Sequence, residues 1–591
     1  MTTLIVLIGA VFYLVLYFTW GKRLEKNVVK ADGKKETPAV RLRDNVDYVP
    51  AHRFVLFGHH FASIAGAGPI TGPAIAMAWG WLPGLLWVWF GNLFIGSIHD
   101  YLSLMASVRY DGNSVQWVAG KLMGERTKFI FELFTYFTLL LILAAFMGTF
   151  GGLAITSPEV VTASVLFIII AVIEGFLLYR TKLPFWLTTV IGVAMLVIVI
   201  VISFTAPFIS VTSARTVYII LFFYMILASS LPVWILLQPR DYLNSFLLYG
   251  GLILGGVGAL IGFKGFSWPA FTTWTAHAVT PAVPSAFWPT VPLVIACGAL
   301  SGFHALVASG TSSKQLDNEL SGLFVGYGGM FTEGFLATLV IVSISAFGMD
   351  IFRDAASGIS QIGLNVDALA GGGAVLGDNY LKVINAKETG IGAAMGIFRQ
   401  SFGRLLNNSF GIPVKFGATF AGLWASAFVL TTLDTATRLA RYAWQELFQL
   451  VKSKPVRGFL TDKWIASIIA SGLGLYLVWT GSYNALWSGF AGANQLLASI
   501  ALLTASVWVK NVQKAGRMWT MAVVIPAVFL WITAFIALIW YVIVVIPTLN
   551  LAFRIPMYIF LIVMIILDVY LVGSFFTNFR KTPEEFAKER G

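Results

Sequence analysis

The chain has 591 residues, of which 58% are hydrophobic and only 11% are charged. An average soluble domain carries about 25% charged residues, so this composition excludes a soluble globular protein and indicates a polytopic membrane protein. The net charge of +12 is typical of Lys and Arg on cytoplasmic loops and does not point to a nucleic-acid partner.

Apolar runs long enough to cross a bilayer recur along the whole sequence and predict an all-α polytopic protein with about fifteen transmembrane helices. Basic loops alternate with loops of low charge, which places the N-terminus outside and the C-terminus in the cytoplasm. The first run has no basic residue before it and is expected to remain as an anchor. The predicted spans are 3–20, 53–77, 81–108, 128–153, 158–179, 183–205, 215–237, 242–263, 289–311, 322–348, 413–435, 463–480, 485–508, 518–546 and 554–576.

The second span contains a sequence that an ordinary helix does not need. Residues 58–73 hold two adjacent histidines, four glycines and two prolines. Glycine and proline free backbone groups from the helix ladder, and a membrane tolerates this only inside protein or along a wet cavity. The pattern therefore predicts a broken helix whose free N–H groups attract a substrate carboxylate; close helix packing by small residues is the alternative. The candidate substrate-binding residues here are Ser63, Gly66, Ala67, Gly68 and Pro69.

A similar pattern occurs in the ninth span, because 58–66 and 302–310 share the motif G-x-H-x5-G. The two spans are seven crossings apart and would run in opposite directions, as in the inverted repeats of secondary transporters. Two seven-span units after one extra span, or a five-span core in spans 2–6 and 9–13, both fit, and a chance match is the alternative. By analogy, Ser309, Gly310 and Thr311 are expected in an unwound segment that contacts substrate or packs closely.

This organisation divides the chain into four parts. They are an anchor with a basic loop (1–50), a first repeat unit (51–288), a second repeat unit with an extracytoplasmic loop at 349–412 (289–576), and a cytoplasmic tail (577–591).

Titratable side chains inside the apolar spans are the candidates for proton coupling. Histidine titrates near neutral pH, and His59 and His60 lie just before the glycine break, while His304 takes the matching place in the ninth span. Glu333 lies in the middle of a span, where a charge is costly and usually functional. A histidine bonded to a carbonyl or water in a polar kink is the alternative. A zinc site formed by the three histidines is an alternative, but no spacing of cysteine or carboxylates supports it, so neither a metal nor a cofactor is expected.

Further polar residues interrupt other spans. Asp434 and Arg438 are spaced i,i+4 and predict an ion pair on one helix face, with a structural or gating role. Asp100, near another cytoplasmic end, is placed in the same gating group. Asn494 and Gln495 form a polar break in the thirteenth span that serves either interhelical hydrogen bonds or substrate contacts.

Four stretches resemble the carbon starvation protein A (CstA) family of bacterial inner-membrane transporters. The resemblance implies uptake of small carbon and nitrogen sources, namely peptides, and in some members pyruvate with a proton. It also implies a link to the amino acid–polyamine–organocation superfamily, and hence a LeuT-like inverted-repeat core. The stretches are 58–69, His99-Asp100-Tyr101 followed by 109–112, 297–306 and 493–498.

These patterns predict a secondary transporter that imports a small carboxylate-bearing nutrient, coupled to a proton or, alternatively, to sodium. The resemblance implies that this nutrient is a peptide or pyruvate and that the protein lies in the bacterial inner membrane. The expected partners are this small molecule, the proton and the lipid bilayer, and the oligomeric state is left open. No Walker A motif or nucleophile elbow is present, so neither ATP-driven transport within the chain nor an enzyme activity is expected. A channel or facilitator without ion coupling is the main alternative, followed by an intramembrane metalloenzyme and a sensor.

Overall fold

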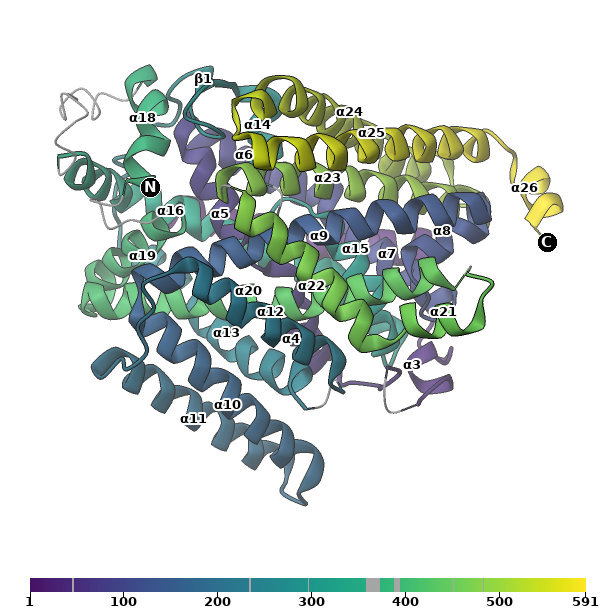
Figure 1. Cartoon of the computed structure of the whole chain (residues 1–591), viewed down its shortest axis with the longest axis horizontal. Coiled ribbons are helices and arrows are strands. Elements are labelled where there is room, and N and C mark those ends of the chain that lie inside the picture. The colour runs from purple at the N-terminus through teal and green to yellow at the C-terminus, as the bar shows by residue number, and fades with distance from the viewer. Residues whose placement is uncertain are drawn as a thin grey trace.

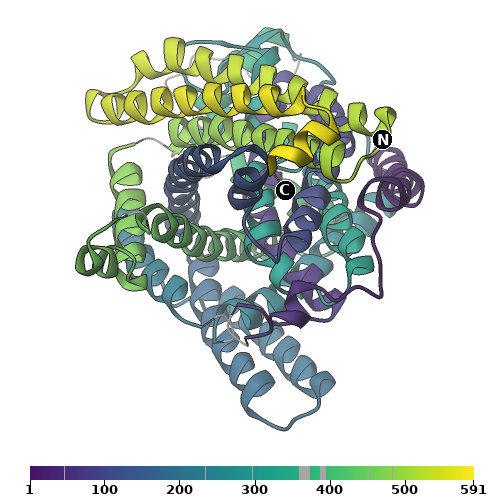
Figure 2. The same ribbon diagram turned by 90° about the vertical axis from the view of Figure 1, so that its right-hand side faces the viewer.

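The computed structural model of the protein describes residues 1–44, 47–232, 235–295, 297–357, 373–386, 394–449, 451–481 and 483–590. Long helices packed side by side make up most of this part of the chain (Figure 1 and Figure 2). Twelve helices among the described residues are long and apolar enough to cross a membrane, and a bent pair adds a thirteenth span. The predicted all-α polytopic fold is therefore confirmed.

The bent pair consists of α4 (Arg53–Ala65) and α5 (Gly68–Ala76), whose axes differ by 41°. The seventh and ninth predicted spans correspond to shorter pieces, α12 (Ala214–Ser230) for the seventh and the pair α14 (Phe287–Val294) and α15 (Gly302–Gly310) for the ninth. The other spans contain α1 (Thr2–Leu16), α6 (Trp81–Gly91) with α7 (Ser97–Arg109), α9 (Glu125–Thr156), α10 (Pro158–Arg180), α11 (Phe185–Thr205), α13 (Leu237–Ile261), α16 (Gly328–Ser357), α20 (Val414–Phe448), α22 (Lys463–Thr480), α23 (Tyr483–Val507), α24 (Arg517–Trp540) and α25 (Leu551–Phe579).

Short elements lie at the two ends of the bundle. The end that holds the N-terminus also carries α18 (Gly373–Asn385), α19 (Ala394–Phe410) and the small strands β1 (Thr275–Ala276) and β2 (Ser285–Ala286) (Figure 1). The opposite end carries the C-terminus with α3 (Pro38–Arg41), α8 (Val115–Met123), α21 (Lys454–Leu460) and α26 (Pro583–Arg590). Helices α18 and α19 belong to the predicted loop 349–412, of which 358–372 and 387–393 lie outside the described residues.

Burial separates central helices from peripheral ones. In the most apolar stretch of α23, 100% of the residues are buried inside the bundle. In the corresponding stretch of α11, only 28% are buried. A helix that is apolar on all sides is suited to either place, because lipid and protein both accept apolar side chains. Helices α10 and α11 form a hairpin that projects from the bundle in both views (Figure 1 and Figure 2).

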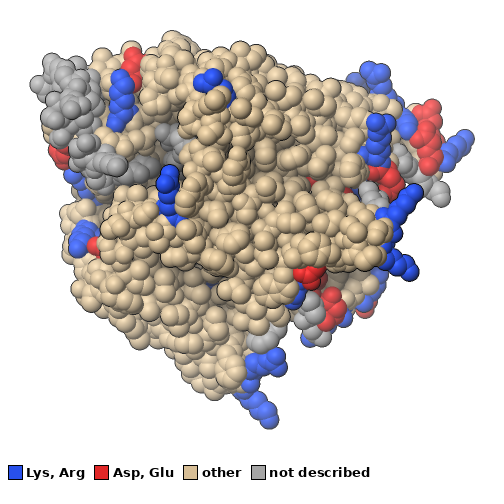
Figure 3. Space-filling model, in the orientation of Figure 1, with Lys and Arg blue, Asp and Glu red and all other residues tan. Residues whose placement is uncertain are grey.

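Basic side chains are concentrated at the end that carries the C-terminus, on the face that Figure 3 shows. The N-terminal amine of Met1 donates a hydrogen bond to the carbonyl of Lys264 at the other end (3.2 Å). The two termini lie at opposite ends of the bundle, which agrees with a chain that crosses the membrane an odd number of times. The direction of the chain in the membrane remains a prediction.

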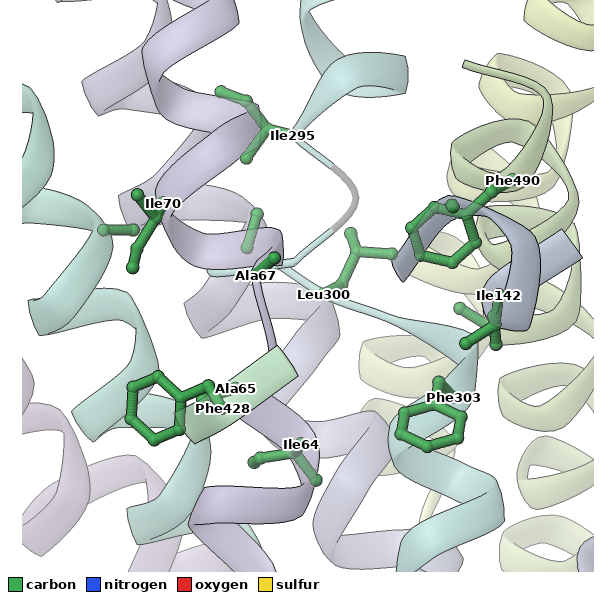
Figure 4. Close-up of a cluster of buried hydrophobic side chains, with 14 of the residues drawn as sticks. Ile64, Ala65, Ala67, Ile70, Ile142, Ile295, Leu300, Phe303, Phe428 and Phe490 are labelled. Carbon is green, nitrogen blue, oxygen red and sulfur yellow. The ribbon is translucent and has the colours of Figure 1, made fainter. Parts of the chain in front are cut away.

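Two helix breaks meet in the middle of the bundle (Figure 4). The first lies between α4 and α5, where Gly66 has a φ of +51°, a region that favours glycine. The second is the connection between α14 and α15, where Gly298 has a φ of +86°. A Cβ atom on Gly68 would lie 2.2 Å from the Cβ of Cys297, so glycine is what lets the two breaks touch.

The shared G-x-H-x5-G motif does not mark equivalent positions. His60 lies in α4 before the first break, whereas His304 lies in α15 after the second break. The prediction of an unwound segment from Ser309 onward is correct only in part. Ser309 and Gly310 are the last residues of α15, whereas Thr311 follows the helix with a non-helical backbone (φ −129°, ψ −52°) and Ser312–Lys314 form a short 3₁₀ turn.

Candidate functional site

His60 forms a buried contact with a carboxylate beside the first break. Its Nε2 lies 2.9 Å from Oδ2 of Asp100 on α7, and its Nδ1 lies 2.8 Å from Oγ of Ser312, just beyond α15. All three side chains are buried. The neutral ring can donate through Nε2 and accept the Ser312 hydroxyl at Nδ1, whereas the protonated ring donates at both nitrogens and the hydroxyl turns to accept. The contact therefore suits both protonation states of the ring.

His59 points to another side of α4 and contacts a buried network in which Arg240 lies between two carboxylates. Its Nδ1 lies 2.7 Å from Oδ2 of Asp241 on α13. Arg240 donates to Oδ1 of Asp241 at 3.2 Å and also donates to the carboxylate of Asp434 on α20. The hydroxyl of Tyr224 donates to the same Asp434 carboxylate at 2.9 Å. Because an isolated buried charge is costly, this alternation is what allows the charges to lie inside the bundle.

His304 and Glu333 form a third pair beside the second break. Nε2 of His304 lies 3.6 Å from Oε2 of Glu333 and 3.2 Å from the carbonyl oxygen of Ile64. Oε1 of Glu333 accepts the N–H of Gly298 at 3.0 Å, which ties α16 to the break. The thiol of Cys297 lies in the same group, and the ligand atoms of Cys297, His304 and Glu333 all lie within 4.8 Å of one another.

The predicted ion pair between Asp434 and Arg438 is wrong. Asp434 is paired with Arg240, while Arg438 donates to the carbonyls of Ala228 (3.0 Å) and Leu231 (2.8 Å). The spacing i,i+4 permits a pair on one helix, but the last carbonyls of α12 need donors and Arg438 supplies them.

Two further partners of the histidines were missed or misplaced by sequence reasoning. A position near a cytoplasmic end favours a structural or gating role for Asp100, and Asp241 was not singled out, yet both are fully buried against histidines of α4. Their histidines are 40 and 182 residues away along the chain, so no local pattern connects them. His99 is also fully buried, and neither of its ring nitrogens has a hydrogen-bond partner among the described residues.

Asn494 and Gln495 make the interhelical hydrogen bonds that were one of their two predicted roles. Oδ1 of Asn494 accepts the N–H of Phe303 at 2.9 Å, and its Nδ2 donates to Oγ of Ser301 at 2.9 Å. The side chain of Gln495 donates to the carbonyl of Pro292. Helix α23 thus supplies partners for the backbone on both sides of the second break.

The residues predicted to cradle a carboxylate lie at the first break and are all buried. The carbonyl of Ser63 accepts a hydrogen bond from Thr432 at 3.3 Å. A Cβ atom on Gly66 would come within 2.7 Å of the Phe146 ring and 2.9 Å of Oγ1 of Thr432. Apolar side chains surround both breaks in this conformation, among them Ile64, Ile142, Leu300, Phe303, Phe428 and Phe490 (Figure 4).

A polar cavity of about 280 Å³ lies between α8, α9, α15 and α20, toward the end that carries the C-terminus. Ser309 and Gly310 line it, together with groups of both charges. Nζ of Lys314 lies 5.4 Å from the ring of Tyr48 and 5.7 Å from that of Tyr442. The carboxylates on the wall belong to Asp47, Glu132 and Glu446. Sequence reasoning missed the charged groups because separate segments bring them together.

Comparison with known proteins gives consistent matches over most of the chain. Residues 1–537 match the sequence model of the family described as carbon starvation protein CstA. The peptide transporter CstA of Escherichia coli (strain K12) is 32% identical over 558 residues, covering 87% of this chain and 78% of that protein. The peptide transporter CstA of Bacillus subtilis (strain 168) is 31% identical, covering 89% of this chain and 88% of that protein.

The pyruvate/proton symporter BtsT of Escherichia coli (strain K12) is 31% identical over 581 residues, covering 89% of this chain and 80% of that protein. Among solved structures, a manganese transporter of Eremococcus coleocola aligns with 91% of this chain and 99% of its own chain, with a TM-score of 0.47 and 11% identity.

Proposed function

The chain belongs to the carbon starvation protein CstA family, and on this premise we propose that it is a proton-coupled secondary transporter that imports a small carboxylate-bearing nutrient. Its relatives are named as peptide transporters and as a pyruvate/proton symporter. Either substrate carries a carboxylate, and either fits import through a bundle of membrane-spanning helices.

The observation that carries proton coupling is the buried contact between His60 and Asp100, at 2.9 Å. When a proton is on the ring, imidazolium and carboxylate cancel, and a neutral pair is tolerated in a dry interior. When the proton leaves, the pair carries one negative charge, which favours a conformation with access to water. The proton thus favours one state of the helix break over the other, which is what coupling requires. The His59–Asp241 pair on the same helix extends this region toward α13 and α20.

The polar cavity favours a peptide over pyruvate. A peptide is a zwitterion and needs a cation for its carboxylate and an anion for its amino group. Lys314 can serve the first, and Glu446 or Asp47 can serve the second. Pyruvate has no cationic group, so it could pair with Lys314 but not with Glu446 or Asp47.

We assign the end with the C-terminus to the cytoplasm of a bacterium with the protein in its inner membrane, because basic residues favour that side. The cavity would then open toward the cytoplasm. In a Cys297→Ser background, Lys264→Cys should react with an impermeant maleimide added to intact cells, and Lys182→Cys should not. The reverse labelling would overturn this orientation.

The decisive experiment uses the purified protein in liposomes with an inward proton gradient. A labelled dipeptide should accumulate above its external concentration, a protonophore should abolish the accumulation, and unlabelled dipeptide should drive counterflow. Flux that does not saturate and ignores the proton gradient would identify a channel instead. Parallel assays with labelled pyruvate decide between the two substrates.

A further inference from the structure

We propose that Cys297, His304 and Glu333 form a binding site for a divalent transition-metal ion of the Zn²⁺ class. The three side chains are buried, and their ligand atoms lie within 4.8 Å of one another. Thiolate, imidazole and carboxylate are the three ligand types that Zn²⁺ takes in proteins. The residues come from the second break, from α15 and from α16, so an ion would join three segments at one point.

Charge balance favours a divalent cation at this place. Both Cys297 and Glu333 carry one negative charge when they act as ligands, and His304 binds a metal as a neutral ring. A divalent ion with these three ligands has no net charge, which is the condition that a buried site in a membrane protein must meet. A monovalent ion or a single proton would leave one charge uncompensated.

A second observation points to a ligand. Oε2 of Glu333 is buried and has no hydrogen-bond partner among the described residues, whereas Oε1 is held by the N–H of Gly298. Buried carboxylate oxygens are nearly always satisfied. The free oxygen faces Nε2 of His304 at 3.6 Å, which is too long for a hydrogen bond. An ion between the two atoms would satisfy the oxygen and replace the 3.2 Å contact of Nε2 with the Ile64 carbonyl.

The fourth coordination position would remain open to a water molecule or another small ligand, as in zinc sites with three protein ligands. No local spacing indicates such a site, because the carboxylate of Glu333 lies 36 residues along the chain from Cys297. Only the packing of α16 against the second break brings them together.

The test uses protein produced in medium that contains Co²⁺, so that the ion can enter during folding. The chain has one cysteine, and a near-ultraviolet band from thiolate-to-Co²⁺ charge transfer can therefore come only from Cys297. The purified protein should show this band and contain one Co²⁺ per chain by elemental analysis. Zn²⁺ in the medium should suppress the band by taking the same site.

Matched variants separate this site from adventitious binding. Cys297→Ser and Cys297→Ala should each remove the band, and Cys297→Ala and Glu333→Gln should lower the metal content to background, in protein whose melting curve shows that it is folded. His277→Gln removes a histidine from a partly exposed pair with Asp378 and should leave the band unchanged. A wild-type protein without the band, or Co²⁺ retained in full by Cys297→Ala, would overturn the proposal. None of these readouts depends on the proposed transport activity.

Discussion

The ring of His60 connects Asp100 to Ser312, with Nε2 2.9 Å from the carboxylate and Nδ1 2.8 Å from the hydroxyl. One titratable ring on α4 therefore touches α7 and the segment that follows α15. The first break begins at Gly66, six residues further along the chain. A change in the charge of this ring acts on both broken spans at once.

Asp100→Asn should separate proton coupling from substrate exchange. The amide keeps the size of the side chain but cannot balance a protonated ring. We expect accumulation driven by a proton gradient to fall to background in liposomes, while counterflow of the dipeptide continues. His277→Gln removes a histidine–aspartate pair from a partly exposed site and is expected to behave as wild type. If Asp100→Asn still accumulated the dipeptide fully in response to a proton gradient, the His60–Asp100 pair would have no part in proton coupling.

Gly66→Ala should destabilise the first break. The residue has a φ of +51°, and an added Cβ would meet the Phe146 ring at 2.7 Å. A non-glycine residue held in a strained backbone region costs about 1–3 kcal/mol, so the melting temperature should fall and transport should be impaired. Gly458→Ala on α21 is the matched control, because a Cβ there meets nothing within 4 Å. Equal melting temperatures for the two variants would contradict the close packing at the break.

Arg240→Met should be far more harmful than Arg438→Met. Arg240 lies between Asp241 and Asp434, and its loss leaves two buried carboxylates without their cation. Removing one partner of a buried ion pair costs about 3–5 kcal/mol. Arg438 donates hydrogen bonds to carbonyl groups, and leaving a buried carbonyl without its donor costs about 1–3 kcal/mol. Chemical denaturation measures both variants. If Arg438→Met lost more free energy of unfolding than Arg240→Met, the result would favour the ion pair between Arg438 and Asp434 that the sequence spacing predicts.

Glu446→Gln and Lys314→Met should discriminate between substrates. If the cavity binds a zwitterion, Glu446→Gln should raise the KM for a dipeptide and leave any pyruvate uptake unchanged. Lys314→Met should weaken uptake of either molecule, because both have a carboxylate. Concentration-dependent uptake gives KM and maximal rate separately. Identical effects of the two variants on a dipeptide and on pyruvate would contradict the proposed division between the charged groups.

The sequence was most informative where the signal is local. Glycine and proline at 66–73 forecast the first break, because these residues disturb a helix wherever they occur. The motif in the ninth span indicates an unwound segment at 309–311, whereas the second break lies before α15. Its backbone is satisfied by Asn494 and Glu333, which lie on other helices, and a pattern within the ninth span cannot reveal them.

The histidines were identified, but their partners were not. His59 and His60 stand out as polar residues in an apolar run, whereas Asp241 and Asp100 look like ordinary charges near helix ends. Tertiary packing decides which carboxylate meets which ring. The same reason explains the error at Asp434, where a partner from α13 displaced the one at i+4.

Proton movement caused by substrate tests the central claim most directly. Liposomes that hold the wild-type protein and an internal pH indicator are given a dipeptide in the absence of any imposed gradient. We predict immediate internal acidification that requires the dipeptide and is absent with His60→Gln. Dipeptide uptake without any change in internal pH would contradict proton-coupled import.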